Sequence, residues 1–279
     1  MLPKLAAFKA SLREKHLGER PLYFAKVDVR SCFDTIPQDR VVAVVNSLMK
    51  LQTYTTGKHV EVSLLGDLQR LHGKHVDSMP LKRYVAHSGS ADEVASFGQL
   101  VRKQLVGAKA NTVFVNTSLQ RHETKDDLMR LLREHVERNL VKIGKKYYRQ
   151  KKGIPQGSVL SSILCNLFYA ELERDVLDFA LEEDCLLLRL LDDFLLISIN
   201  RARAERFVRV MHRGHSDYGV VVQLDKSLTN FDMMTDDGGR VPSTPTDFQF
   251  PYCGVCIDTR TLEVGKKTVR ARKAGKMVL

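Results

Sequence analysis

Two adjacent carboxylates, Asp192 and Asp193, stand between two apolar runs and constrain the fold of this chain more than any other feature. Each run is about six residues long and apolar on nearly both faces, which predicts strands buried in a sheet. A two-residue polar connection between such strands predicts a tight hairpin. Two anions at a hairpin tip repel each other unless a cation lies against them. The pair therefore indicates either a solvated Asp-Asp turn or a divalent-metal site.

The charge of the chain favours a polyanionic partner. Lysine and arginine number 44 against 33 aspartates and glutamates, which gives a net charge of +11 over 279 residues. Nucleic acid is the first candidate on this ground and an anionic membrane surface the second. No apolar run approaches the roughly 18 residues of a membrane span, and five cysteines, an odd number, lie scattered in apolar segments. We expect a soluble, intracellular protein with reduced thiols and no membrane partner.

Three short spacings are weak signals for a metal. Cys253 and Cys256 form a lone Cys-x-x-Cys, without a second pair at zinc spacing. The His-x-x-His pairs His72/His75 and His212/His215 lack neighbouring acids or cysteines arranged to complete a site. We interpret these four histidines as polar surface residues.

A third acid, Asp28, lies near the C-terminal end of the first predicted strand, Tyr23–Val29. With a long insertion left out, the elements run strand, helix, strand, strand, helix, strand, which is the split β-α-β order of ferredoxin-like sheets. In that order the third strand lies between the first and the second and is antiparallel to both. The end of the first strand then meets the start of the third, so we expect Asp28 beside Asp192 and Asp193.

Three carboxylates at one sheet edge are strongly repulsive without cations. Hard oxygen ligands of this kind suit Mg²⁺, which keeps waters and takes substrate phosphates as further ligands. Two such ions roughly 3.5 to 4 Å apart are the standard device for in-line phosphoryl displacement. In a basic protein, nucleotidyl transfer on a nucleic acid is therefore the leading interpretation.

The remaining elements are predicted from periodicity and turn residues. A long helix over residues 159–182, apolar around most of its girth, is expected to pack beneath the sheet. The fourth strand is predicted at residues 218–224. A hairpin is predicted from residues 249–258 and 261–264. The insertion, residues 41–140, is predicted to be mainly helical, with a capping box at Thr124.

Basic residues alternate with Tyr147 and Tyr148 in a hairpin-like segment over residues 141–152. Such a pattern can follow a phosphate backbone and stack on bases, and a solvated charged turn is the alternative. The candidates for nucleic-acid contact are Lys145, Lys146, Arg149, Lys151 and Lys152.

Five segments, taken in order, resemble motifs A to E of the reverse transcriptases. They are Val27–Arg40, Gly153–Ser161, Leu188–Leu196, Lys226, and Tyr252–Gly254 with Asp258–Val264. The amino-acid sequences of motifs A, C and E resemble those of the telomerase reverse transcriptases. An insertion of about a hundred residues between motifs A and B is a second resemblance to that family. Retroviral and intron-encoded enzymes usually lack an insertion of that size at this place. The resemblance implies a polymerase palm in an α+β fold.

The resemblance assigns roles by position. It implies that Asp28 and Asp192 bind two Mg²⁺ ions, with support from Asp193 and the Val29 carbonyl, and that Lys226 assists the leaving pyrophosphate. Phe33 falls where these enzymes place a steric gate against ribose, an ordinary core phenylalanine being the alternative. The resemblance further implies a nucleotide-binding loop made by Gln156, Gly157 and Ser158. It implies a primer grip made by Tyr252, Cys253 and Gly254.

The implied division of the chain has six parts. These are a basic helix and linker at 1–21, palm with motif A at 22–40, the insertion in fingers at 41–140, palm with motifs B to D at 141–248, the primer-grip hairpin at 249–264 and a basic tail at 265–279. The implied partners are a telomerase RNA template, a single-stranded DNA 3′ end, deoxynucleoside triphosphates and telomere proteins, at chromosome ends in the nucleus.

Fingers motifs before motif A and a thumb after motif E have no candidate in this sequence. Two alternatives to a telomerase polymerase therefore stay open. One is a retroelement-type reverse transcriptase, and the other is a truncated, inactive fragment that binds nucleic acid.

Overall fold

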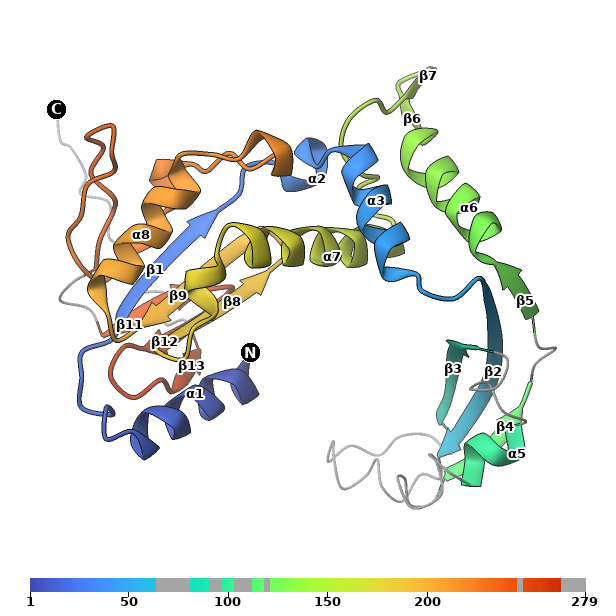
Figure 1. The fold of residues 1–279 in the computed structure, drawn as a ribbon, viewed down its shortest axis with the longest axis horizontal. Coiled ribbons are helices and arrows are strands. Elements are labelled where there is room, and N and C mark those ends of the chain that lie inside the picture. Colours follow the sequence, from blue (N-terminus) through green and yellow to red (C-terminus); the bar gives the residue numbers. More distant parts are fainter. Residues whose placement is uncertain (64–80, 91–96, 103–111, 118–120, 245–247, 267–279) are drawn as a thin grey trace, which may run out of the picture. The chain divides into compact units, whose positions relative to one another are not determined.

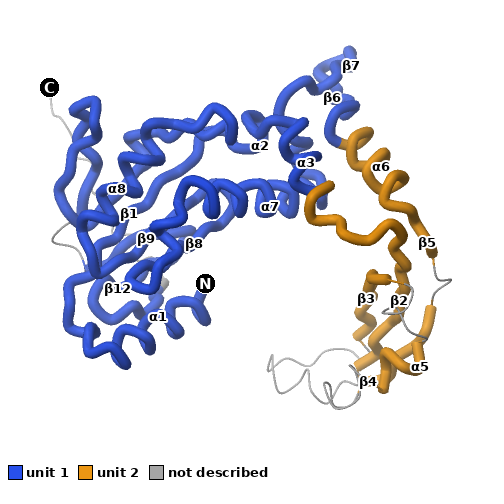
Figure 2. The backbone as a smooth tube through the Cα atoms, in the orientation of Figure 1, with its two compact units in different colours: residues 1–45, 136–279 blue, residues 46–135 orange. Residues whose placement is uncertain are grey.

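The computed structural model describes residues 1–63, 81–90, 97–102, 112–117, 121–244 and 248–266. The chain divides into two compact units, residues 1–45 with 136–279, and residues 46–135 (Figure 2). His72, His75 and most of the predicted basic tail lie outside the described residues. Within the described part of the chain, no helix is both long and apolar enough to cross a membrane.

The first unit is built on a four-stranded sheet in the order β10-β1-β9-β8, with every neighbouring pair antiparallel. Its strands are β1 (Tyr23–Asp28), β8 (Cys185–Leu190), β9 (Asp193–Ser198) and β10 (Leu228–Thr229). The third strand of the predicted order, β9, lies between the first and the second, as the connection rules require. The chain is thus a mixed α/β protein, and its sheet has the strand order predicted for a split β-α-β unit.

Different elements cover the two faces of this sheet (Figure 1). The alternation along β1 directs Phe24, Lys26 and Asp28 to one face, where Phe24 joins a buried cluster with residues of α1 (Leu2–Glu14) and the second, three-stranded sheet. On the other face, α8 (Arg201–His212) contacts β1 and β9. The ring of Tyr169 on α7 (Val159–Asp175) packs edge-on against Phe194 of β9.

Two predicted elements of this unit were wrong in extent. The helix over residues 159–182 ends at Asp175 and is followed by the short helix η2 (Asp178–Leu181). It is also buried along one side only, since Val159 and Ile163 are exposed. The fourth strand is not at residues 218–224, where Val220 and Val222 form only isolated bridges; the edge pairing with β1 is made by β10.

The predicted hairpin over residues 249–264 is in fact a three-stranded sheet. Its strands are β11 (Gln249–Tyr252), β12 (Val255–Asp258) and β13 (Val264–Lys266). The turn that sequence reasoning missed is at Cys253 and Gly254, whose φ angles of 46° and 81° are those of a tight primed hairpin turn. The sequence did not predict this turn because Cys253 stands where Asn or Gly is usual.

Short elements connect these parts of the first unit. They are α2 (Cys32–Thr35), α3 (Gln38–Leu48, which continues into the second unit), β6 (Leu140–Ile143), β7 (Lys146–Arg149), η3 (Ser216–Tyr218) and η4 (Leu224–Lys226). Strands β6 and β7 pair as the hairpin predicted for the basic segment.

Among the described residues of the second unit, strands predominate over helices. Its described strands are β2 (Thr53–Ser63), β3 (Leu81–Gly89), β4 (Thr112–Asn116) and β5 (Arg121–Thr124), in the order β3-β2-β4 with β5 paired to β2. Sequence reasoning missed strand β2 because its inner face buries polar residues, Thr55, His59 and Glu61, so no apolar alternation marks the strand.

Two helices are described in this second part of the chain, α5 (Phe97–Leu100) and α6 (Lys125–Glu137), the last two residues of α6 belonging to the first unit. The predicted cap of α6 is confirmed, since the Asp127 amide donates to Thr124 Oγ1 at 3.1 Å.

Candidate active site

The three predicted carboxylates come together at one end of the two central strands of the main sheet, β1 and β9. Asp28 ends β1, Asp193 begins β9, and the two residues are direct partners in the antiparallel register. Asp192 lies in the turn between β8 and β9, and its carbonyl accepts the Val29 amide at 3.0 Å. Leu191 takes a φ of 57°, unusual for a side chain that branches, which shows how tight this turn is. The geometric expectation about Asp28 is confirmed.

The electrostatics of the three acids differ. Burial raises the pKa of Asp192, and the neighbouring charges of Asp28 and Asp193 raise it further. Asp28 Oδ1 accepts from Lys226 Nζ at 3.2 Å, which joins the predicted motif D lysine to the acids. Asp193 Oδ1 is buried, accepts no hydrogen bond from the described residues, and lies 3.5 Å from Lys26 Nζ.

The chemical type of these side chains suits a divalent cation. Carboxylate oxygens are the ligands that Mg²⁺ prefers. A positive charge would stabilise both the buried Asp193 Oδ1, which accepts no hydrogen bond from the described residues, and the Asp192 carboxylate, whose pKa is raised. Within the described residues, no group of three or more His, Cys, Asp or Glu side chains converges on one point closely enough to hold a metal ion. The lysines therefore supply the positive charge in this arrangement.

The predicted nucleotide-binding loop is fastened to the turn that carries Phe33. The Ile154 amide donates to the Phe33 carbonyl at 2.7 Å, and Gln156 Nε2 donates to Asp34 Oδ1 at 3.0 Å. Gly153 has a φ of 76°, and a Cβ there would lie 2.2 Å from the Phe33 carbonyl oxygen, so only glycine allows this approach. Phe33 itself is half-buried, which disfavours the alternative of an ordinary core phenylalanine.

The loop leads directly into α7. Ser158 caps the helix, its Oγ accepting the Leu160 amide at 3.2 Å. Gly157 has a φ of 80° and open space where a Cβ would stand. The loop is thus held at both ends while its middle stays accessible.

The predicted primer-grip residues contact Asp193. Tyr252 is buried, and its hydroxyl donates to the Asp193 carbonyl at 3.0 Å. Cys253 Sγ lies 3.7 Å from Asp193 Oδ2. Gly254 completes the β11–β12 turn. The packing of the second sheet on the first brings this turn to the acids.

The predicted basic residues lie on the β6–β7 hairpin and the strand-to-loop segment after it. Both strands of the hairpin are exposed along their whole length. Arg149 donates from Nε to the Glu137 carbonyl at 2.9 Å. Lys151 and Lys152 line a cavity of about 490 Å³ with Gln38 and Asp39 at the start of α3.

Sequence reasoning missed two charged residues of the site. Lys26 precedes Asp28 by two residues and shares its face of β1, which is the signal that could have found it. Arg189 is a lone charge in an apolar strand; its guanidinium bonds Glu173 Oε1 at 2.5 Å and Asn166 Oδ1 at 2.8 Å, both on α7. Arg189 thereby fixes α7 to the strand that leads into Asp192.

The remaining histidine pair is not on the open surface. His212 is half-buried, and its Nε2 lies 2.9 Å from Ser227 Oγ. His215 Nε2 lies 3.0 Å from the Val210 carbonyl. Both residues bond to their own part of the fold, which corrects the expectation of surface histidines.

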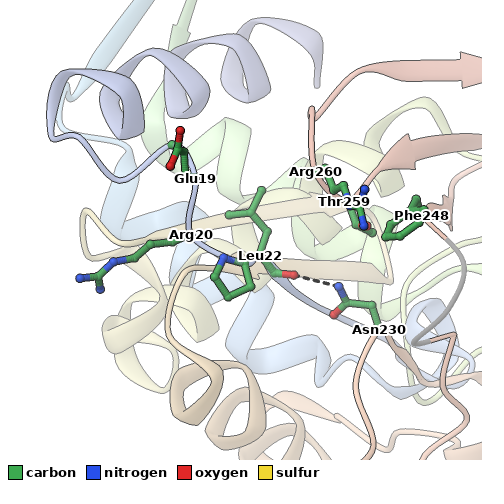
Figure 3. Close-up of a pocket in the computed structure, with 9 residues that line it drawn as sticks. Glu19, Arg20, Leu22, Asn230, Phe248, Thr259 and Arg260 are labelled. Atoms are coloured by element: carbon green, nitrogen blue, oxygen red, sulfur yellow. Dashed lines mark hydrogen bonds between the residues drawn. The ribbon is translucent and has the colours of Figure 1, made fainter.

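A second cavity, of about 480 Å³, lies apart from the predicted site residues, none of which lines it (Figure 3). Asn230 donates to the Leu22 carbonyl at 2.8 Å, and the Arg260 guanidinium lies 3.6 Å from the ring centre of Phe248. The polar groups of Asn230 are thus engaged within the fold.

Comparison with known proteins places this geometry in a family. Residues 116–255, half of the chain, match the family model described as reverse transcriptase (RNA-dependent DNA polymerase). The telomerase reverse transcriptase of Canis lupus familiaris is 37% identical over 250 residues, which are 87% of this chain and 21% of the dog protein. That of Bos taurus is 34% identical over 250 residues, 88% of this chain and 21% of the bovine protein.

Solved structures agree in fold. Apo telomerase from Candida tropicalis superposes with a TM-score of 0.61 and 21% identity, over 95% of this chain and 35% of that one. Telomerase from the same organism in complex with a TWJ fragment of telomeric RNA gives a TM-score of 0.61 and 20% identity, over 96% of this chain and 33% of that one. The chain spans about a fifth of the length of the curated relatives it matches.

Proposed function

The chain belongs to the reverse transcriptase family of RNA-dependent DNA polymerases, and on that premise we propose that it is the palm, with its insertion, of a telomerase that adds deoxynucleotides to a DNA 3′ end. The observation that carries the proposal is the meeting of Asp28, Asp192 and Asp193 at one end of the central strands β1 and β9. The insertion, which includes the separate unit 46–135, favours a telomerase over a retroelement-type enzyme.

Asp28 and Asp192 hold two Mg²⁺ ions in this proposal, with Asp193 and the Val29 carbonyl beside them. When bound, the ions activate the primer 3′ hydroxyl and neutralise charge on the leaving pyrophosphate. A cation would stabilise the Asp192 carboxylate, because burial and its two acidic neighbours raise its pKa. Lys226 contacts Asp28 and is more than half exposed, so its ammonium is free to turn toward the pyrophosphate and donate a proton.

The nucleotide is selected between Phe33 and the Gln156–Ser158 loop. The Ile154–Phe33 hydrogen bond and the Gln156–Asp34 hydrogen bond support this, because they hold the loop against the Phe33 backbone and the Asp34 side chain. The half-buried ring of Phe33 then clashes with a ribose 2′-hydroxyl. Gly157, with open space where a Cβ would stand, allows close approach of a base or sugar.

The primer 3′ end is held by Tyr252, Cys253 and Gly254, whose contacts with Asp193 support a place next to the metals. The exposed basic residues Lys145, Lys146, Arg149, Lys151 and Lys152 follow the phosphates of the template RNA and the DNA. The partners are a telomerase RNA, a single-stranded DNA 3′ end, deoxynucleoside triphosphates and telomere proteins, at chromosome ends in the nucleus.

Primer extension tests the proposal. The chain is incubated with a DNA primer, a template RNA, Mg²⁺ and deoxynucleotides, and the same segment is tested in place of its counterpart in the full-length dog relative. We expect template-directed incorporation that is lost in Asp192→Asn. Extension on any RNA without repeats would favour the retroelement alternative, and nucleic-acid binding without incorporation in either format would favour the inactive fragment.

A further inference from the structure

Asp193 has a carboxylate whose two oxygens meet two different elements. Oδ1, which is buried, lies 3.5 Å from Lys26 Nζ on β1. Oδ2 lies 3.7 Å from Cys253 Sγ, in the turn between β11 and β12, where the thiol is placed to donate. The carboxylate therefore spans from the main sheet to the turn of the second sheet.

The main chain of the same residue makes a second link to that turn. The Tyr252 hydroxyl donates to the Asp193 carbonyl at 3.0 Å, and the residue is only 3% exposed. Tyr252 also belongs to the apolar cluster between the two sheets. Its phenol is thus fixed in place, and it holds the Asp193 backbone while Cys253 meets the side chain.

The turn adopts a conformation that brings the thiol to Asp193. Cys253 has a φ of 46°, in the left-handed region that side chains other than Gly, Asn and Asp seldom adopt. Such a conformation is unfavourable for a residue that carries a side chain. The contact of Sγ with Asp193 is one interaction that offsets this cost.

Lys26 supplies the charge that keeps the Asp193 carboxylate in this bridging position. It lies on the same face of β1 as Asp28 and diagonal to Asp193, whose direct partner is Asp28. The Lys26 and Asp193 side chains are only 23% and 27% exposed. Without the Lys26 ammonium, the buried Asp193 Oδ1 has no positive charge beside it and is opposed by the Asp28 carboxylate. This repulsion favours rotation of the Asp193 side chain away from Cys253.

We propose that Lys26 is a positioning residue that acts through Asp193 and Cys253 to set the turn that holds the DNA 3′ end. The inference rests on the proposed function of that turn. It gives Asp193 a role different from that of Asp28 and Asp192, since its carboxylate links the primer-holding turn to the active site. Lys26 itself touches neither nucleotide nor primer in this account.

Steady-state kinetics of primer extension test this inference. We expect Lys26→Met to raise the KM for the DNA primer by about tenfold, because a partly buried charged contact is lost. The KM for deoxynucleotides and the Mg²⁺ concentration at half-maximal rate stay unchanged. Lys26→Arg restores part of the primer affinity. Lys4→Met, at an exposed lysine of α1, is the matched control and leaves all three quantities unchanged.

A double-mutant cycle identifies the route of the effect. Cys253→Ala alone is expected to raise the primer KM by less than Lys26→Met does, and the double variant to behave like Lys26→Met, because both act through Asp193. A shift in the Mg²⁺ requirement with an unchanged primer KM, or full additivity of the two changes, would overturn the inference. Circular dichroism confirms that each variant is folded.

The chain and the dog chimera are both assayed. Failure of the wild type to extend a primer in both formats counts against the proposed function itself. Normal wild-type extension with an unaltered primer KM in Lys26→Met counts against Lys26 alone.

Discussion

Asp28 and Asp193 lie directly opposite each other on neighbouring antiparallel strands, and each is paired with a different lysine. Lys226 Nζ lies 3.2 Å from Asp28 Oδ1, and Lys26 Nζ lies 3.5 Å from Asp193 Oδ1. Like charges at such cross-strand positions are destabilising. The two lysines, one beside each carboxylate, offset this repulsion, so the two acids stay on paired strands before substrate or metal binds.

Replacing Gly153 with alanine tests how the nucleotide loop is fastened. The new Cβ would lie 2.2 Å from the Phe33 carbonyl oxygen and would stand on a φ of 76°. We expect Gly153→Ala to lower the free energy of unfolding by about 2 to 3 kcal/mol and to raise the KM for deoxynucleotides. Denaturant unfolding and primer extension measure the two effects.

Gly157→Ala is the matched control for this change. Gly157 also has a positive φ, of 80°, but nothing lies within 4 Å of its Cβ position. The variant is a control for stability only, because Gly157 belongs to the proposed nucleotide-binding loop: its free energy of unfolding should fall by about 1 kcal/mol, from backbone strain alone. Equal losses in the two variants would show that the contact with Phe33 does not fasten the loop.

The positions of the three carboxylates were predictable because they depend on local patterns and on connection rules. The apolar runs beside Asp192 and Asp193 gave β8 and β9, and the element order gave the place of Asp28. The β11–β12 turn was missed because Cys253 stands at a left-handed position where Asn or Gly is usual. The contacts of Asp193 with Tyr252 and Cys253 were not predictable, since they arise from packing between two sheets.

The other errors have a common cause. Strand β2 buries Thr55, His59 and Glu61, so its inner face carries no apolar signal. The segment around Val220 and Val222 has the composition of a strand, but it pairs only through isolated bridges, while the two-residue strand β10 forms the sheet edge. In both places, tertiary contacts determine where the strands form, and the apolar periodicity of the sequence does not predict them.

Phe33 is expected to exclude ribonucleotides. We expect Phe33→Ala to raise the incorporation of ribonucleotides relative to deoxynucleotides by about tenfold or more, because the ring no longer occupies the space of the 2′-hydroxyl. Competition assays with both sugars measure the ratio. Phe248→Ala, at an exposed phenylalanine outside the predicted site, serves as control. An unchanged ratio in Phe33→Ala would remove the gate assignment.

His212 is expected to make the stability of the first unit depend on pH. Burial lowers its pKa in the folded chain, although Asp237 opposes the shift. The unfolded chain, with an ordinary pKa near 6.5, therefore binds a proton more readily than the folded one. Stability is fully present above about pH 6.5 and declines as the pH falls below that value toward the lowered pKa of the folded state.

Thermal unfolding at a series of pH values tests this dependence. His212→Gln keeps a hydrogen-bonding group near Ser227 but does not titrate. We expect its melting temperature to fall less than that of the wild type between pH 7 and pH 5. Parallel curves for the two proteins would show that another group controls the acid sensitivity.

The most direct measurement of the central claim is Mg²⁺-dependent, RNA-templated primer extension by Asp28→Asn, Asp192→Asn and Asp193→Asn. Asparagine keeps the size of each side chain and removes the charge that a metal needs. We expect the first two variants to lose at least about a thousandfold in rate, and Asp193→Asn to retain measurable extension, because its carboxylate faces Lys26 and Cys253. Near-wild-type extension in Asp28→Asn or Asp192→Asn, or equal tolerance at all three positions, would contradict the account.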